Sequence, residues 1–464
     1  KRHDGQAVTC DDFLKAMEDA NNLDLSKFSY WYQQLGTPSL QIIRNKRASE
    51  IEMLIVQKKP ENCGKHYQAM MIPFRFSLND KAGNALSLII NGKKMGAEPL
   101  IIINEEETLL SIRSADKSRT NDLLDAIPSY LRGFSAPVNL CDDRTIDDYI
   151  HLISSDSDPF VIWDSMQLLY SKVIIQDYKD DKDINLELRL SNALLKSLKN
   201  QKLNNALKAL LLLPPSQSVL LTKVVEPDPP RIFLAKQNVL RRMSLNIQKY
   251  LQKKLDIKIS YFDTMDSSGR SLHNQLLAWG MLGGMGIAQT LALKQVSLFN
   301  MTLVKGSISA LNHIDVPSRE IALERFHDNW KTNSLVMENW FMWQSSSAVK
   351  GTVKKCRELM KHPSFDRNNP NKLRAVIGSF ANGNPVHFHA NDCSGYEFLA
   401  EQLLKIDKKN SQISAKLALP LTRFANFSSE RKGLMLNILK KLNENNLSSD
   451  LSEVVKKSLG SSDN

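Results

Sequence analysis

Residues 207–215 read Leu207-Lys208-Ala209-Leu210-Leu211-Leu212-Leu213-Pro214-Pro215, a leucine-rich segment that ends in two prolines. The leucine spacing is typical of a helix, with Leu207, Leu210 and Leu211 three and four positions apart. The proline pair then ends the helix, because proline lacks a backbone N–H. From Thr145 onward the helical pattern recurs, broken repeatedly by Pro, Gly, Asn and Ser. We therefore expect short antiparallel helices stacked in series, as in an irregular α-solenoid over residues 139–464.

Upstream of this region the apolar pattern changes to period two, which is typical of β-strands. We expect strands at residues 51–55, 74–78, 100–103 and 108–112. The third of these, Leu100–Ile103, is continuously apolar and is expected to be buried. Residues 79–84 have the composition of a turn. The spacing of these segments predicts a small β-sandwich over residues 38–138.

Residues 1–37 are predicted to be helical. Thr9 and Asp12 have the offset of a capping box, and an amphipathic helix carrying Phe13 and Met17 follows. A second helical stretch is expected from about Asp24 to Gly36. These two helices cannot form a domain alone, and we expect the chain to be a piece of a longer protein.

Composition and charge argue against several classes of function. The 464 residues carry a net charge of +11, but both signs are interleaved along the chain, so nothing indicates nucleic-acid binding. No run of apolar residues is long enough to insert into a membrane. The 5 cysteines are odd in number and widely spaced, which favours a reduced, cytoplasmic compartment.

Local motifs for chemistry are weak, and each has a structural alternative. There is no His-Glu-x-x-His motif. His387 and His389 could form a metal pair, although packing or hydrogen bonding is favoured. The glycines at 280–286 could suggest a nucleotide loop, but a corner between two helices is favoured because a helix precedes them. Cys10 and Cys393 are expected to be structural.

Two other segments have alternative interpretations. The charged run Asp177–Asp183 is expected to be a solvated loop. The aromatic cluster of Trp330, Trp340, Phe341 and Trp343 could line a ligand cavity, although aromatic residues at helical spacing usually belong to a core.

Many short stretches, in the same order along the chain, resemble those of one known protein family. Near the start they are Arg2-His3-Asp4-Gly5, Thr9-Cys10-Asp11-Asp12-Phe13, Ala16-Met17-Glu18-Asp19-Ala20, Trp31-Tyr32 and Gly36-Thr37-Pro38. Further along they are Ser135-Ala136-Pro137-Val138, Trp163-Asp164, Trp340-Phe341, Asn368-Asn369-Pro370-Asn371, Ile377-Gly378-Ser379-Phe380 and Phe388-His389-Ala390. Together these stretches resemble the second half of bacterial-type aminopeptidase N, and the resemblance covers essentially the whole chain.

The resemblance implies a multidomain α+β fold. Residues 1–37 correspond to the C-terminal end of a thermolysin-like metallopeptidase catalytic domain, and residues 38–138 to a small β-sandwich domain. Residues 139–464 correspond to a large all-α superhelical domain of the armadillo or HEAT kind.

The family's reaction removes N-terminal amino acids from peptides with a zinc ion held by residues upstream of this chain. No catalytic residue, metal ligand or cofactor is therefore expected in this chain, which should be inactive alone. The expected partners are peptide substrates of the parent enzyme and its missing catalytic and N-terminal domains. The resemblance also implies a cytoplasmic monomer without nucleic-acid or membrane partners.

The resemblance assigns two residues of the helical domain to substrate binding. In the family, basic residues of this domain face the cavity over the active site, and Arg374 falls at one such position. Lys416 lies where relatives tend to carry Arg, which keeps the charge but loses the guanidinium fork. An ion pair between helices is the structural alternative for Arg374.

The alternative is a function from a different class. An autonomous α-solenoid scaffold could bind a protein or a nucleic acid through its surplus of basic residues. The apparent end of a catalytic domain at residues 1–37 argues against this alternative, since a scaffold has no reason to begin within a domain.

Overall fold

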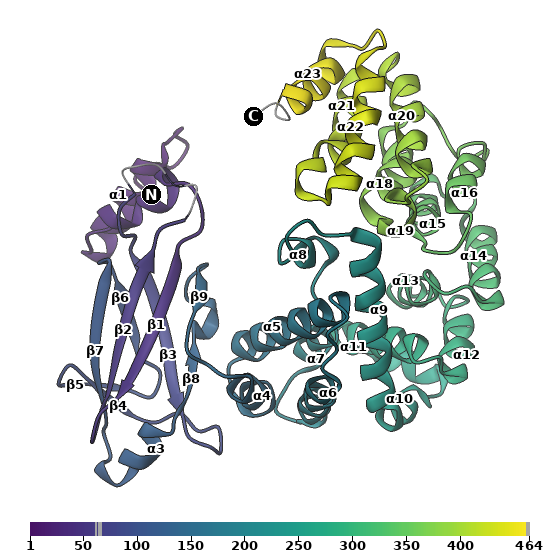
Figure 1. Cartoon of the computed structure of the whole chain (residues 1–464). Coiled ribbons are helices and arrows are strands. Elements are labelled where there is room, and N and C mark those ends of the chain that lie inside the picture. Colours follow the sequence, from purple (N-terminus) through teal and green to yellow (C-terminus); the bar gives the residue numbers. More distant parts are fainter. Residues whose placement is uncertain (61–62, 64–66, 461–464) are drawn as a thin grey trace. The chain divides into compact units, whose positions relative to one another are not determined.

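The structure is a computed structural model that describes residues 1–60, 63 and 67–460. It divides into two compact units, Lys1–Leu169 and Tyr170–Asn464 (Figure 1). Every strand of the described residues lies in the first unit, and the second unit is helical. The predicted fold class, a small β-sandwich followed by a large helical domain, is confirmed.

Nine strands build the sandwich of the first unit in the described part of the chain. They are β1 (Ser39–Lys46), β2 (Ile51–Lys58), β3 (Ile72–Asn79), β4 (Leu88–Ile90), β5 (Lys93–Gly96), β6 (Leu100–Ile103), β7 (Glu107–Ser114), β8 (Ile127–Tyr130) and β9 (Asn139–Cys141). One sheet has the order β5-β4-β7-β2-β1-β9 and the other has the order β6-β3-β8. Strand β9 pairs with β1 in parallel, and the remaining pairs are antiparallel.

The core of the sandwich lies between the inward faces of the two sheets. Met53 and Ile55 of β2 are fully buried, as are Phe74 and Phe76 of β3. The period-two prediction is therefore confirmed for both strands. The expectation that Leu100–Ile103 is buried throughout is wrong, because β6 is an edge strand and its Leu100 and Ile102 are exposed.

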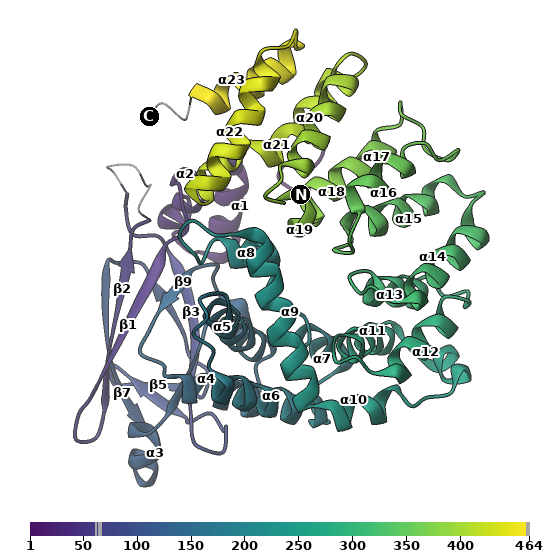
Figure 2. The same cartoon turned by 45° about the vertical axis from the view of Figure 1, so that its right-hand side comes forward.

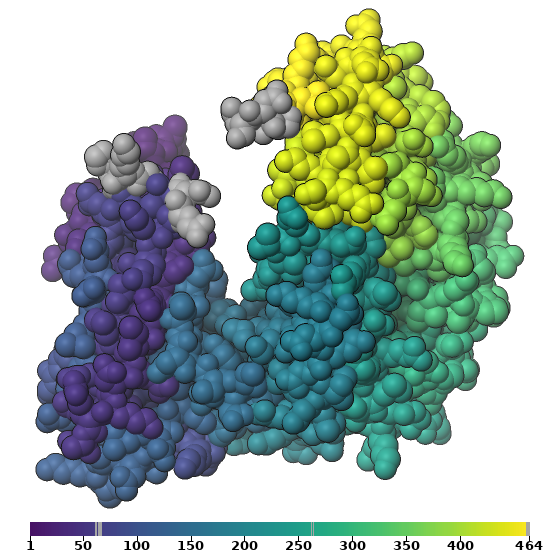
Figure 3. Space-filling view, viewed as in Figure 1, coloured from purple at the N-terminus to yellow at the C-terminus, as the bar shows by residue number. Residues whose placement is uncertain are grey.

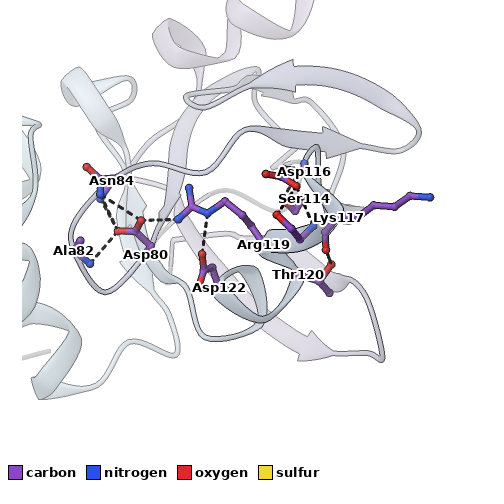
Figure 4. Close-up of polar contacts among 10 residues, drawn as sticks. Asp80, Ala82, Asn84, Ser114, Asp116, Lys117, Arg119, Thr120 and Asp122 are labelled. Carbon is purple, nitrogen blue, oxygen red and sulfur yellow. Dashed lines mark hydrogen bonds and ion pairs between the residues drawn. The ribbon is translucent and has the colours of Figure 1, made fainter.

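The turn predicted at residues 79–84 is present and is held by one carboxylate (Figure 4). Asp80 Oδ1 accepts hydrogen bonds from the backbone N–H groups of Ala82 (2.9 Å) and Asn84 (2.8 Å). Arg119, from the 3-10 turn η2 (Lys117–Arg119), binds the other oxygen of Asp80 at 2.6 Å and Asp122 at 2.8 Å. Asp122 belongs to α3 (Thr120–Leu124), so the arginine links this helix to the turn.

The first residues form α1 (Cys10–Asn21), and the predicted capping box between Thr9 and Asp12 is present. No residue of α1 is buried, and Phe13 is 60% exposed. The second predicted helix is instead two short pieces, η1 (Ser26–Phe28) and α2 (Tyr30–Gln33). Tertiary contacts hold these pieces, including a hydrogen bond of 2.9 Å from Trp31 Nε1 to the Met71 carbonyl.

A buried arginine joins the sandwich to the first long helices. Arg132 lies in η3 (Arg132–Phe134), after β8, and donates to Asp156 Oδ1 at 2.8 Å. Asp156 is the C-cap of α4 (Ile146–Ser155) and also accepts a hydrogen bond from Asn79 of β3 at 3.1 Å. Helix α5 (Pro159–Tyr178) follows and crosses the division between the two units.

The second unit is a series of helices stacked along a curved path, as two views show (Figures 1 and 2). The first members are α6 (Ile184–Lys199), α7 (Asn205–Leu211), α8 (Gln217–Leu221), α9 (Pro229–Asn246), α10 (Gln248–Leu255), η4 (Ile259–Thr264), α11 (Ser267–Leu282), α12 (Gly286–Gln295), α13 (Met301–Leu311) and α14 (Pro317–Trp330). The later members are α15 (Ser334–Ser346), α16 (Thr352–Leu359), α17 (Pro370–Leu373), η5 (Arg374–Gly378), α18 (Ser379–Gly383), α19 (Pro385–Phe388), α20 (Ser394–Asp407), α21 (Ser411–Thr422), η6 (Phe424–Asn426), α22 (Ser429–Asn443) and α23 (Ser449–Gly460).

Helices of this unit pack on neighbours along the series, and their side chains fill the spaces between them (Figure 3). Helix α11 packs against both α7 and α13, and α21 packs against both α20 and α23. Helix α7 ends at Leu211, just before Pro214 and Pro215, as predicted. The glycines at 280–286 form the corner between α11 and α12, so the favoured interpretation of that motif is confirmed.

The expectation of a solvated loop at Asp177–Asp183 is wrong for Asp177. Helix α5 continues to Tyr178, and the side chain of Asp177 is 4% exposed. Arg242 of α9 donates to Asp177 at 2.6 Å and to Glu187 at 2.7 Å, so both buried carboxylates share one cation. A buried carboxylate requires such a partner. Asp177, the first residue of the charged run, therefore has a structural role in the packing of α5 against α9.

Candidate functional site

The residues predicted to bind substrate meet at one cavity of about 660 Å³ in the second unit. Four elements that are distant in sequence form its wall: α15, η5, α18 and α21. Arg374 lies at the start of η5, and Lys416 lies in α21. The structure thus brings together the two cationic side chains that the sequence analysis selected.

The wall that carries Arg374 is one continuous but irregular helix. Helix α17 runs into the π-helical turn η5, which continues into α18. Such π-turns are rare and often occur at functional sites, because they shift the side chains that follow by one position. Gly383 closes α18 against α15, since a Cβ atom there would lie 3.3 Å from Ser346 Cβ.

Arg374 and Lys416 are both exposed and both lack a carboxylate partner among the residues that the structure describes. Arg374 Nη1 donates to Asn371 Oδ1 at 3.1 Å, which orients the guanidinium and leaves its other N–H groups available. The alternative of an ion pair between helices therefore finds no acidic partner for Arg374 within the described chain. Two unpaired cations at one cavity favour an anionic or strongly polar ligand.

The rest of the cavity combines apolar and neutral polar groups. Ile413 and Leu417 of α21 and Met342 of α15 supply apolar surface. Asn382 Nδ2 donates to the Gly378 carbonyl at 3.0 Å, so the amide oxygen of Asn382 remains able to accept a hydrogen bond. A cavity with apolar walls, amide groups and two cations can bind a peptide backbone together with a carboxylate.

His387 and His389 make hydrogen bonds to different partners. Asn384 caps α19, and His387 Nε2 lies 3.0 Å from the Ala348 carbonyl. His389 is buried, and its Nδ1 lies 2.7 Å from the Tyr396 hydroxyl. Burial lowers the pKa of His389 to about 3, helped by the nearby Arg431. The favoured interpretation of packing and hydrogen bonding is confirmed for both histidines.

The structure also reveals a histidine pair that sequence reasoning missed. His327 Nε2 of α14 lies 3.2 Å from His362 Nε2, although the residues are 35 positions apart in the sequence. The Trp340 ring lies tilted against both imidazole rings, at centroid distances of 5.1 Å and 5.3 Å, and all three side chains line a separate cavity of about 440 Å³. The aromatic cluster is therefore divided, because Phe341 and Trp343 belong to the core while Trp340 reaches a cavity. No local spacing pattern could have revealed this pair.

The described residues do not fit a zinc ion. No group of three or more His, Cys, Asp or Glu side chains among residues 1–60, 63 and 67–460 is arranged to hold a metal. His362 also fits poorly as a ligand through Nε2, because its Nδ1 accepts a hydrogen bond from the Ser364 N–H at 3.1 Å. A neutral imidazole bound to metal through Nε2 would carry a proton at that Nδ1.

Two family models match the chain, and together they cover most of its length. The model described as "Domain of unknown function (DUF3458_C) ARM repeats" matches residues 146–460. A second model, described as "Domain of unknown function (DUF3458) Ig-like fold", matches residues 36–143. Within the described residues, no helix is both long enough and apolar enough to cross a membrane.

Three curated relatives are all named Aminopeptidase N. The chain is 31% identical to the protein of Escherichia coli strain K12, over 99% of this chain and 53% of that protein. It is 29% identical to the Haemophilus influenzae protein, over 98% of this chain and 53% of the relative. It is 30% identical to the Caulobacter vibrioides protein, over 99% of this chain and 52% of that relative. The resemblance to aminopeptidase N is thus confirmed, and the chain spans about half the length of these relatives.

A solved structure, the aminopeptidase A of Legionella pneumophila in complex with aspartic acid, has the same fold. The TM-score is 0.80 at 24% identity, with 98% of this chain and 53% of that chain covered. At this identity the match supports the fold alone.

Proposed function

Because the chain belongs to the family described as Domain of unknown function (DUF3458_C) ARM repeats, we propose that it is the C-terminal part of an aminopeptidase. The parent protein is a zinc-dependent aminopeptidase N that removes N-terminal amino acids from peptides. This part supplies the β-sandwich and the helical chamber that closes over the active site, and it is not catalytic alone. The similarity to three proteins named Aminopeptidase N over nearly the whole chain supports this proposal.

One observation carries the role of the helical domain in substrate binding. Arg374 and Lys416 line the same cavity, and neither has a carboxylate partner within the described residues. An exposed cation without an acidic partner is available for the carboxylate or the backbone carbonyls of a peptide. We therefore assign peptide binding, rather than the chemical step, to these two residues.

The remaining parts of the proposal follow from the resemblance. Zinc and its ligands belong to a catalytic domain outside this chain, and residues 1–37 complete that domain. The exposed apolar face of α1, with Phe13 and Met17, is the surface that the rest of the catalytic domain covers. The division into residues 1–37, 38–138 and 139–464, the cytoplasmic location and the monomeric state belong to the same proposal. Nucleic acid and membranes are not among the proposed partners.

Calorimetric titration of the 464-residue chain with two forms of one tripeptide tests the binding role. Both forms are acetylated at the N-terminus, and they end in either a free carboxylate or an amide. We expect Arg374→Ala to weaken binding of the acid about tenfold and to leave binding of the amide nearly unchanged, because only the acid offers a charge-assisted contact. Lys416→Arg should strengthen binding of the acid, since a guanidinium can bind a carboxylate through two N–H groups.

Lys408→Ala is the matched control, because it removes one exposed cation that does not line the cavity. It should leave the affinity for both forms unchanged. Equal affinities of the acid and the amide for the unmodified chain and for Arg374→Ala would overturn the proposed role of the cavity.

A further inference from the structure

A second cavity of about 650 Å³ adjoins the one that contains Arg374 and Lys416. The two cavities share Asn382, which lines both of them. Both lie within the second compact unit. The two cavities are therefore neighbours on either side of Asn382.

Helix α21 runs along both cavities with one face. Ile413, Lys416 and Leu417 line the first cavity, while Pro420 and the C-cap residue Arg423, which follows the end of α21, line the second. These positions follow one another at intervals of one or three residues, which keeps them on a single helix face. Lys416 and Arg423 are seven residues apart, and the backbone between them is helical up to Thr422, so their Cα atoms are separated by about 10.5 Å along the helix axis.

Arg423 is an exposed cation without an acidic partner among the described residues, like Arg374 and Lys416 in the first cavity. Its side chain is exposed, and no hydrogen bond or ion pair of that side chain occurs among the described residues. Glu226 lines the same cavity but lies beyond ion-pair distance of Arg423. His389 also lines the cavity, and it adds no positive charge near neutral pH, because burial keeps its imidazole neutral.

The walls of the second cavity suit an extended apolar segment between charged positions. Val225 is 92% exposed, and Pro227, Pro420 and Phe427 contribute further apolar surface. We infer that the two cavities form one groove that binds an extended peptide with two acidic groups, the first at Arg374 and Lys416 and the second at Arg423. This inference rests on the proposed peptide-binding function and extends it to a preference for acidic peptides.

The spacing of the cations selects the spacing of the acidic groups. A peptide in the polyproline II conformation rises about 3.1 Å per residue and returns to the same face every three residues. Residues i and i+3 therefore lie on one face about 9.3 Å apart, close to the separation of Lys416 and Arg423 along α21. Residues i+2 and i+4 of such a peptide lie on other faces. The groove should thus prefer glutamates at i and i+3.

Three proline-rich peptides test this inference on the 464-residue chain. Each is acetylated and amidated and carries two glutamates, which are two, three or four positions apart, so that all three have the same charge. Fluorescence anisotropy should show that the peptide with the three-residue spacing binds about tenfold more tightly than the others, because it alone reaches all three cations. Arg423→Ala should remove this preference, and Arg423→Lys should keep most of it. Lys408→Ala, which removes a cation outside the groove, should change none of the affinities.

The outcomes separate this inference from the function on which it rests. Equal affinities of the three peptides, or a preference that survives Arg423→Ala, would overturn the two-site groove. If Arg374→Ala then still weakens binding of every peptide, the proposed function stands without the second site. If none of the peptides binds, both the groove and the proposed peptide-binding role are wrong.

Discussion

Arg132 and Asp156 form an ion pair of 2.8 Å whose two side chains are 2% and 0% exposed. The arginine follows strand β8 of the sandwich, and the aspartate ends helix α4. Glu98 and Ser157 also accept hydrogen bonds from Arg132, at 2.8 Å and 2.9 Å. One buried cation thus fixes the position at which the chain leaves the sandwich and becomes helical.

Arg132→Ala should destabilise the chain by about 3 to 5 kcal/mol, because it leaves the Asp156 carboxylate buried without its cation. Urea unfolding followed by circular dichroism measures this loss. Arg119→Ala is a suitable control, since it removes an arginine that binds two carboxylates near the protein surface. Its effect should be much smaller. Equal losses for the two variants would show that the buried pair has no special role.

The stability of the helical unit should fall as the pH is lowered from about 6.5 toward 3. Burial lowers the pKa of His389 to about 3, whereas in the unfolded chain the pKa of this histidine is near 6.5. Between these values the unfolded state binds one more proton than the folded state, so the free energy of unfolding decreases by up to about 1.4 kcal/mol per pH unit. His389→Gln should reduce this slope in urea titrations across the pH range. An unchanged slope in His389→Gln would contradict this expectation.

Brief proteolysis should cut first within residues 1–37. Helix α1 has no buried residue, and it exposes Phe13 and Met17, so local opening exposes little further apolar surface. Mass spectrometry of the earliest fragments identifies the cut. The junction after β9 should resist cleavage, because Asp142 and Arg144 form a buried ion pair of 2.7 Å there. Protection of α1 equal to that of the helical unit would contradict this expectation.

The chain alone should neither bind zinc stoichiometrically nor hydrolyse aminoacyl amides. Its 464 residues contain no His-Glu-x-x-His motif, and the described residues hold no cluster suited to a metal ion. Metal analysis after dialysis, together with a chromogenic assay, tests both statements. One tightly bound zinc ion per chain, or turnover that persists after further purification, would contradict the assignment of catalysis to another part of the parent protein.

Local patterns predicted the elements whose residues are close in the sequence. Thr9 and Asp12 lie three positions apart and form the expected capping box, and Pro214 follows the end of α7. The stretch from Asp24 to Gly36 was predicted less well, because contacts with distant residues, such as that of Trp31 with Met71, replace a regular helix. Local spacing carries no information about such contacts.

The candidate site illustrates the same limit. Arg374 and Lys416 were selected by resemblance, since neither belongs to a local motif with a recognisable chemistry. Their common cavity depends on how η5 packs against α21, and periodicity within either element does not predict that packing. The close approach of His327 and His362 was missed for the same reason.

Peptide binding in the cavity between Arg374 and Lys416 can be followed at Met342. Its side chain lines that cavity and is 37% exposed. In a chain labelled with ¹³C at the methionine methyl groups, the Met342 signal, assigned with Met342→Leu, should shift saturably as the acetylated tripeptide acid is added. The Met17 signal should stay in place, and Arg374→Ala should raise the midpoint of the Met342 titration about tenfold. A Met342 signal that does not move while the peptide binds, or a midpoint unchanged by Arg374→Ala, would show that the peptide does not bind in this cavity.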